Sequence, residues 1–141
     1  MVSFSNVTVT FGNGHSALRD VSFKVDTNEF VFLVGPSGAG KSTILNTIMG
    51  IHKPSTGSVE VGDPPKNINK LKGNKLAELR QSIGFVFQDF KILPYKSIFE
   101  NVLVALKVKN VPTQFHKAEV MNTLKSVGLV EKATEFPIQL S

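Results

Sequence analysis

The stretch Gly35-Pro-Ser-Gly-Ala-Gly-Lys-Ser-Thr43 decides the fold class of this 141-residue chain. It satisfies the phosphate-binding pattern G-x-x-x-x-G-K-[ST] at every position. Five continuous apolar residues, 30–34, precede it, as in a strand that is buried on both faces of a parallel sheet. Ser42–Met49 follows with apolar residues at helical spacing, closed by Gly50. This order of strand, glycine-rich loop and helix predicts an α/β fold of the P-loop type.

Each position of this loop has a chemical reason. The glycines allow positive φ angles, so that backbone N–H groups can surround a phosphate closely. The helix that begins near Lys41 directs the positive end of its dipole at the same place. We expect Lys41 to reach the β- and γ-phosphates of a nucleotide, Ser42 to bind Mg²⁺ and Thr43 to contact the α-phosphate. The predicted nucleotide contacts are Gly35, Pro36, Ser37, Gly38, Ala39, Gly40, Lys41, Ser42 and Thr43.

A polar pair follows a second predicted buried strand, Ile83–Phe87, in the sequence Phe85-Val-Phe-Gln-Asp89. Ligands of parallel α/β sheets bind at the carboxyl ends of the strands. Gln88 is therefore a candidate to contact Mg²⁺ or an attacking water. Spacing alone favours an ordinary polar residue at a strand end, and this alternative stays open.

The remaining periodicity predicts strands before the loop and helices after it. Alternation favours strands over Ser3–Phe11 and Val21–Val25, with a turn at Asn13-Gly14 between them, and a short strand over Ser58–Val61. Helical patterns cover Asn74–Gln81, a segment from the capping box Ser97-Ile-Phe-Glu100 to about Lys107, and Thr113 to Gly128. The last of these presents Phe115, Ala118, Met121 and Leu124 on one face, and Leu129–Phe136 adds one further turn.

Composition is that of an ordinary globular protein, with a net charge of +5. No apolar run approaches the ~20 residues that cross a bilayer, the N-terminus lacks a signal-peptide pattern, and cysteine is absent, which fits a cytosolic protein. The densest basic segment, 66–80, has no interleaved aromatic residues, so we do not expect a nucleic-acid partner. A solvated helix face is the favoured interpretation of this segment, and proximity to an anionic membrane surface is the alternative. His15, His52 and His116 follow no metal-ligand or catalytic spacing and are interpreted as surface or turn residues.

With these motifs in place, the chain resembles the ATP-binding subunits of ABC transporters over all 141 residues. The loop matches the Walker A sequence of that family, Gln88 matches the Q-loop glutamine, and Leu140-Ser141 matches the first two residues of the Leu-Ser-Gly-Gly-Gln signature. Phe11 falls where the family keeps an aromatic residue, usually Tyr, that stacks on adenine. The segments 87–94 and 127–141 are most similar to bacterial cell-division ATPases of the FtsE type, and the lipoprotein-releasing and macrolide-export ATPases share much of the pattern.

The resemblance implies the N-terminal part of one ABC ATP-binding domain, with ATP and Mg²⁺ as cofactors. Residues 1–29 and 57–62 would form a mainly β subdomain, 30–50 the Walker A core, 83–89 the Q-loop strand and 96–141 an incomplete helical subdomain. In the family, strand neighbours of the Walker A strand come from later residues, so 30–34 would here lack a parallel neighbour. The family also implies a homodimer, and an integral membrane partner of the FtsX type that docks near Asp89–Leu106. The subunit would then lie peripherally on the cytoplasmic face of the plasma (inner) membrane.

Three readings of activity follow. The first is an ATPase subunit whose 141 residues do not hydrolyse ATP alone, because no Asp or Glu follows a hydrophobic strand as the Walker B motif requires, and the catalytic glutamate and switch histidine of the family have no counterpart. The second, a small-molecule kinase, is disfavoured because it would need an acceptor pocket and a lid that bears arginine, and the chain contains only Arg19 and Arg80. The third is a non-catalytic binding module, which ATP turnover by the isolated chain would eliminate.

Overall fold

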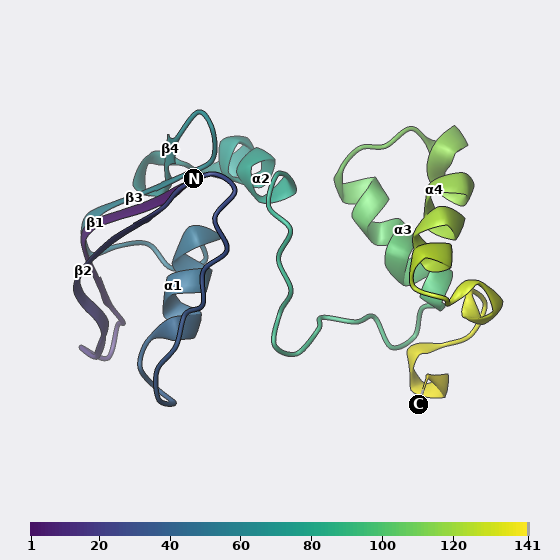
Figure 1. Ribbon diagram of the computed structural model, residues 1–141, viewed down its shortest axis with the longest axis horizontal. Coiled ribbons are helices and arrows are strands. Elements are labelled where there is room, and N and C mark those ends of the chain that lie inside the picture. The colour runs from purple at the N-terminus through teal and green to yellow at the C-terminus, as the bar shows by residue number, and fades with distance from the viewer. Residues whose placement is uncertain (141) are drawn as a thin grey trace. The chain divides into compact units, whose positions relative to one another are not determined.

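The computed structural model describes residues 1–140 and divides the chain into two compact units, Met1–Ile83 and a second that begins at Gly84 (Figure 1). The first unit contains β1 (Val2–Thr10), β2 (Ser16–Val25), α1 (Lys41–Ile48), β3 (Thr56–Val61), β4 (Lys66–Asn67) and α2 (Gly73–Gln81). The second contains α3 (Ile98–Val108) and α4 (Thr113–Ser126). Short 3₁₀ turns lie at Ile68–Lys70 in the first unit, and at Val130–Lys132 and Pro137–Gln139 in the second.

The sheet of the first unit is antiparallel, in the order β2-β1-β3-β4. Alternation along β1 buries Phe4, Val7 and Val9 on one face, which α1 and α2 cover with Ile44 and Leu79. The predicted strands of this region are confirmed, although β2 begins five residues earlier than its alternating pattern, and β4 was not predicted.

A bulge explains why Phe4 and Val7 are three residues apart and yet share a face. The register of β1 shifts between them, and Asn6 there has a φ of 48°. The Asn6 amide donates a 2.9 Å hydrogen bond to Asp20 of β2. Gly57 of β3 crosses this bulge so closely that a side-chain carbon would collide with the carbonyl of Asn6, and its φ is +80°. Only glycine fits there without strain.

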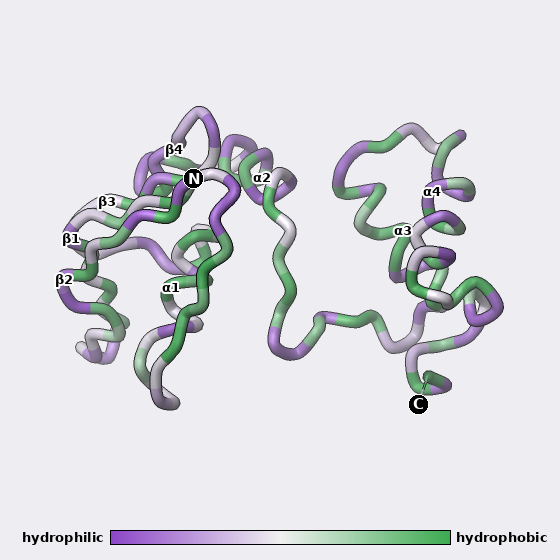
Figure 2. Tube along the Cα trace, in the orientation of Figure 1, coloured by the Kyte–Doolittle hydropathy of each residue, from purple (hydrophilic) through white to green (hydrophobic). Residues whose placement is uncertain are grey.

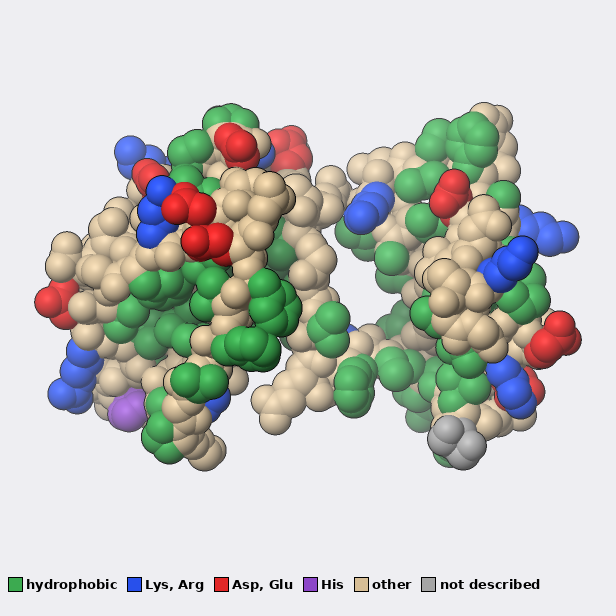
Figure 3. All heavy atoms as spheres, viewed as in Figure 1, with side chains coloured by type: hydrophobic (Ala, Val, Ile, Leu, Met, Phe, Trp, Pro, Cys, Tyr) green, Lys and Arg blue, Asp and Glu red, His purple; other side chains and the backbone are tan. Residues whose placement is uncertain are grey.

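The predicted strand at 30–34 forms no ladder with any strand in residues 1–140. Its side chains are exposed, from 43 % at Leu33 to 84 % at Phe30, and Figure 2 shows this hydrophobic run before α1. A strand requires hydrogen-bonded neighbours, and the described chain supplies none here. An apolar groove of about 260 Å³ lies between this segment, α1 and the edge formed by Val2, Phe23 and Val25. Figure 3 shows hydrophobic side chains gathered over this unit.

The predicted strand at 83–87 is likewise not paired within the described residues. Residues 84–87 form no regular secondary structure, and the rings of Phe85 and Phe87 meet edge to face with their centroids 4.6 Å apart. The reason is the same as for 30–34, because a buried parallel strand depends on neighbours from elsewhere in the sequence.

The second unit is a helical pair closed by the C-terminal residues. The predicted capping box is confirmed: Ser97 Oγ accepts from the Glu100 N–H, and Glu100 accepts from the Ser97 N–H. The first N–H groups of α3 donate to the carbonyls of Glu135 and Ala133, each at 2.8 Å. These bonds satisfy backbone donors that a helix start leaves unpaired.

The predicted face of the helix from Thr113 is wrong in part. Leu124 is buried and Met121 half-buried, but Ala118 and Phe115 are exposed, and Val120 is fully buried in their place. The cause lies in the partners of α4. Ile98 of α3 and Ala133 of the returning chain both pack on the side that carries Val120 and Leu124.

Candidate functional site: a phosphate-binding loop with an aromatic wall

The glycine-rich loop ends at the N-terminus of α1, as predicted. Gly40 occupies the N-cap position with a φ of 89°, and no side chain caps the helix. The first turn contains no acidic residue. The N–H groups of this turn and the positive end of the helix dipole therefore face a concave loop, which is an arrangement that favours an anion.

The Lys41 ammonium lies over the loop. It donates hydrogen bonds of 2.7 Å to the carbonyl oxygens of Gly35 and Pro36. The carbonyls of the loop thus hold the Lys41 ammonium over the loop, in front of the N-terminus of α1. Gly35 and Pro36 contribute through these carbonyls, whereas the pocket wall is formed by the residues from Ser37 onward.

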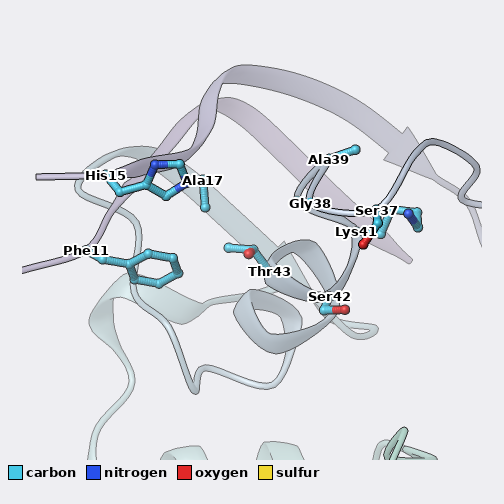
Figure 4. Close-up of a pocket in the computed structure, with 10 residues that line it drawn as sticks. Phe11, His15, Ala17, Ser37, Gly38, Ala39, Lys41, Ser42 and Thr43 are labelled. Carbon is cyan, nitrogen blue, oxygen red and sulfur yellow. The ribbon is translucent and has the colours of Figure 1, made fainter. Parts of the chain in front are cut away.

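The pocket over this loop has a volume of about 280 Å³. It is lined by Ser37 to Thr43, together with Phe11, His15 and Ala17 from the end of β1 and the start of β2 (Figure 4). The structure therefore brings Phe11 to the same pocket as the loop, although Phe11 precedes Lys41 by thirty residues in the sequence. A charged, N–H-rich end and an aromatic end within one pocket suit a ligand with phosphates at one side and a flat ring at the other.

The hydroxyl-bearing residues Ser42 and Thr43 differ in exposure. Ser42 is exposed and Thr43 half-buried, and both line the pocket. Within residues 1–140 no group of three His, Cys, Asp or Glu side chains could hold a metal ion. A single serine hydroxyl fits Mg²⁺ only when phosphate oxygens and water supply most of the ligands, which is the usual manner in which Mg²⁺ accompanies a nucleotide.

His15 and Ala17 are lining residues that sequence reasoning missed. We interpreted His15 as an ordinary surface residue because its spacing matched no catalytic pattern. The available signal was the turn at Asn13-Gly14, which folds His15 back beside Phe11. The Phe11 N–H donates to the His15 carbonyl at 2.8 Å, and the two rings are stacked with centroids 6.4 Å apart.

Gln88 lies in the second unit, exposed in a turn that continues to Lys91. The adjacent Asp89 forms a 2.6 Å ion pair with Lys91. The hydrogen bond from Lys91 lowers the pKa of the Asp89 carboxyl, because it stabilises the charged form. The pocket described above is lined by residues of the first unit alone.

A family model described as ABC transporter matches residues 18–141. The chain belongs to the ABC transporter family. It is 40 % identical to the cell division ATP-binding protein FtsE of Mycobacterium tuberculosis, and 40 % identical to that of Bacillus subtilis, with all of this chain and 61 % of each relative covered. It is also 38 % identical to the methionine import ATP-binding protein MetN 1 of Bacillus thuringiensis, over all of this chain and 42 % of that protein.

The solved structures agree with the sequence relatives. A dimeric ATP-binding cassette in a post-hydrolysis state, bound to ADP and Pi, matches with a TM-score of 0.87 and 36 % identity, covering all of this chain and 63 % of that one. The predicted fold class, an α/β ABC-type ATPase domain in its N-terminal part, is confirmed. The chain spans about 60 % of the length of the FtsE relatives that it matches. None of the helices described in residues 1–140 has the length and apolar character to traverse a bilayer.

Proposed function

We propose that this chain is the nucleotide-binding part of an ABC-type ATPase subunit that binds ATP with Mg²⁺. The observation that carries the proposal is the Lys41 ammonium, held over the loop by two carbonyls at 2.7 Å and facing the uncapped start of α1. Triphosphate oxygens offer that ammonium a charged partner in place of two neutral carbonyls, and charge-assisted hydrogen bonds are the stronger ones. In this assignment Ser42 binds the Mg²⁺ that ATP brings, Thr43 contacts the α-phosphate and Phe11 stacks on adenine.

The test is titration calorimetry with MgATP on a folded protein that contains residues 1–141. Lys41→Ala should remove measurable binding, because the phosphates lose their only charged side-chain contact in the described pocket. Lys53→Ala is the matched control. Its ammonium also donates to two backbone carbonyls, those of Asn69 and Leu71, but outside the pocket. Unchanged affinity in Lys41→Ala, with circular dichroism showing both variants folded, would refute the assignment.

We further propose that residues 1–141 on their own bind nucleotide and do not turn it over. In-line attack needs a positioned water as well as bound phosphates. Gln88 is the candidate to orient that water and to contact Mg²⁺, but an amide accepts no proton near neutral pH and cannot act as the base. Mg²⁺-dependent phosphate release by the purified chain at the rate of an intact ATPase, abolished by Lys41→Ala, would contradict this.

For the full-length protein we propose ATP-driven coupling to an integral membrane partner in bacterial cell division. The support is the similarity to FtsE proteins from M. tuberculosis, Streptococcus pneumoniae, B. subtilis and Escherichia coli. The partner would be FtsX-like and would dock near Asp89–Leu106, placing the subunit peripherally on the cytoplasmic face of the membrane. A homodimer is supported by the dimeric cassettes among the solved structures. Co-purification with the division partner, rather than with a lipoprotein-releasing or macrolide-type export partner, is the deciding experiment.

A further inference from the structure

The turn between β1 and β2 holds two aromatic rings nearly parallel at the wall of the nucleotide pocket. The rings of Phe11 and His15 are inclined by 19°, with centroids 6.4 Å apart. For comparison, the rings of Phe4 in β1 and Phe23 in β2, which are paired across the sheet, are inclined by 17° with centroids only 4.6 Å apart. Phe4 and Phe23 are in direct contact, whereas Phe11 and His15 face each other at a greater separation.

Hydrogen bonds close the turn that carries the two rings. The Phe11 N–H donates to the His15 carbonyl at 2.8 Å, the Gly14 N–H donates to the Phe11 carbonyl at 2.9 Å, and the His15 N–H donates to Asn13 Oδ1 at 3.1 Å. His52 supports the Phe11 ring independently through an edge-to-face contact at 5.1 Å. The two rings therefore stand on a closed, hydrogen-bonded turn, and both line the pocket.

The spacing suits a flat ring between them. Carbon atoms in contact lie about 3.5 Å apart, so two rings on opposite faces of a base are separated by roughly 7 Å. With their centroids 6.4 Å apart, the rings of Phe11 and His15 must separate by at least about 0.6 Å to admit one. Figure 4 shows Phe11 and His15 on one side of the pocket, with Ser42, Thr43 and Lys41 across from them. A base between the rings would leave its sugar and phosphates directed toward the loop.

We propose that His15 is the second face of the base site, so that the nucleotide base is clamped between Phe11 and His15 rather than stacked on Phe11 alone. The inference rests on the proposed nucleotide-binding function and extends it. Stacking recognises the π-face of a base and not its edges, so the clamp accepts any base and favours the larger area of a purine. Ligands of this site are then purine nucleoside triphosphates, with weaker binding of pyrimidine nucleotides.

Calorimetry separates the clamp from the phosphate site by comparing ATP with inorganic tripolyphosphate, which has no base. His15→Ala should weaken ATP about five-fold or more and leave tripolyphosphate binding unchanged, because only the base loses a contact. His15→Phe restores a ring face and should recover most of the ATP affinity. His116→Ala is the matched histidine control, since that ring bonds to the Val111 carbonyl in the second unit. Equal ATP affinity in His15→Ala and the unchanged protein would overturn the clamp.

A second measurement needs no substitution. Nuclear Overhauser contacts from the adenine protons of bound MgATP should reach the ring protons of both Phe11 and His15. Contacts to Phe11 alone mean that the base is stacked on one side, and they overturn the inference while the proposed function stands. Failure of the proposed function gives a different result, in which neither ATP nor tripolyphosphate responds to Lys41→Ala.

Discussion

Arg80 of α2 donates a 2.9 Å hydrogen bond from Nε to the backbone carbonyl of Met49, the residue that caps the C-terminus of α1. A second nitrogen of its guanidinium donates to the Gly50 carbonyl at 3.2 Å. The last carbonyls of a helix lack partners within the helix and carry the negative end of its dipole. α1 has no basic residue in its own last turn, so Arg80 supplies that charge from α2 to the helix that bears Lys41.

Arg80→Met should lower the free energy of unfolding of the first unit by on the order of 1–2 kcal/mol, because two carbonyls lose a charged donor while the aliphatic stem remains. The free energy of unfolding of Arg80→Lys should lie between those of Arg80→Met and the unchanged protein, because an ammonium cannot donate to both carbonyls as the planar guanidinium does. Urea unfolding followed by circular dichroism measures both. Arg19→Met is the control, because Arg19 is exposed on β2 and its side chain makes no hydrogen bond or ion pair within residues 1–140. If Arg80→Met unfolds at the same urea concentration as the control, the capping role is wrong.

Gly40 should be irreplaceable in the phosphate loop. Its φ of +89° is strained for any other residue, and an added side-chain carbon would lie 2.6 Å from the Ala17 carbonyl oxygen and 2.8 Å from Leu18. Gly40→Ala should therefore displace the loop from β2, weaken MgATP at least ten-fold and destabilise the first unit by about 1 kcal/mol or more.

Gly12→Ala is the matched substitution for Gly40→Ala. A side-chain carbon at Gly12 meets nothing within 4 Å, and the residue lies outside the pocket lining. The free energy of unfolding of Gly12→Ala should be unchanged or raised by about 0.5 kcal/mol, because alanine restricts the unfolded chain. Thermal melts and MgATP titrations of the two variants side by side decide the matter. Wild-type affinity in Gly40→Ala would show that the loop tolerates a shift away from β2.

The elements that were predictable from sequence depend on local signals. The loop before α1 and the capping box of Ser97 and Glu100 are each specified within four to nine neighbouring residues, and both are present. The runs 30–34 and 83–87 have strand composition, but pairing is a non-local property, and no ladder includes them in residues 1–140. Periodicity alone also placed Phe115 and Ala118 wrongly on the covered side of α4, because Ile98 and Ala133 determine which residues are covered. His15 was missed for the same reason, since its place in the pocket depends on how the turn folds it back.

The segment before α3 should carry the contact with the membrane partner. Tyr95 is 90 % exposed and Phe90 71 % exposed, although both are large and apolar. Ile98 and Phe99, which lie in the same predicted docking range Asp89–Leu106, instead pack into the helical core. Asn101 holds residues 93–97, which include Tyr95, in place through hydrogen bonds to Leu93 and to the carbonyls of residues 96 and 97. A fixed, exposed apolar surface of this kind suits a protein partner.

Tyr95→Glu or Phe90→Glu in the full-length protein should abolish co-purification with the membrane partner and preserve MgATP binding, because burying a new charge opposes docking. Tyr95→Phe keeps the apolar ring and should co-purify normally. Phe115→Glu, at a half-exposed position of α4, controls for the introduction of a charge elsewhere in the second unit. Co-purification of Tyr95→Glu at the wild-type level would move the docking surface away from this segment.

The start of α3 should respond to acid through Glu100. Its carboxylate accepts a 2.9 Å hydrogen bond from Lys96 and another of 2.9 Å from the Ser97 N–H. The Lys96 contact first, and the Ser97 N–H second, lower the pKa of Glu100 below its ordinary 4.5. A carboxyl whose pKa is lower in the folded state stabilises that state fully above the unfolded pKa, and this contribution is lost as the pH falls through the folded value.

Glu100→Gln should therefore flatten the decline in stability of the second unit below about pH 4.5, where the unchanged protein begins to lose this contribution. The amide still accepts from the Ser97 N–H, so the capping geometry survives while the titration disappears. Lys96→Met should give a smaller effect of the same sign, because it removes the first cause of the lowered pKa and leaves the second. Helical ellipticity in urea between pH 6 and about pH 3 measures the slope of stability against pH. The control is Glu119→Gln, because Glu119 is an exposed residue of α4. A slope for Glu100→Gln equal to that of the control would show that this carboxylate does not link the folding of α3 to pH.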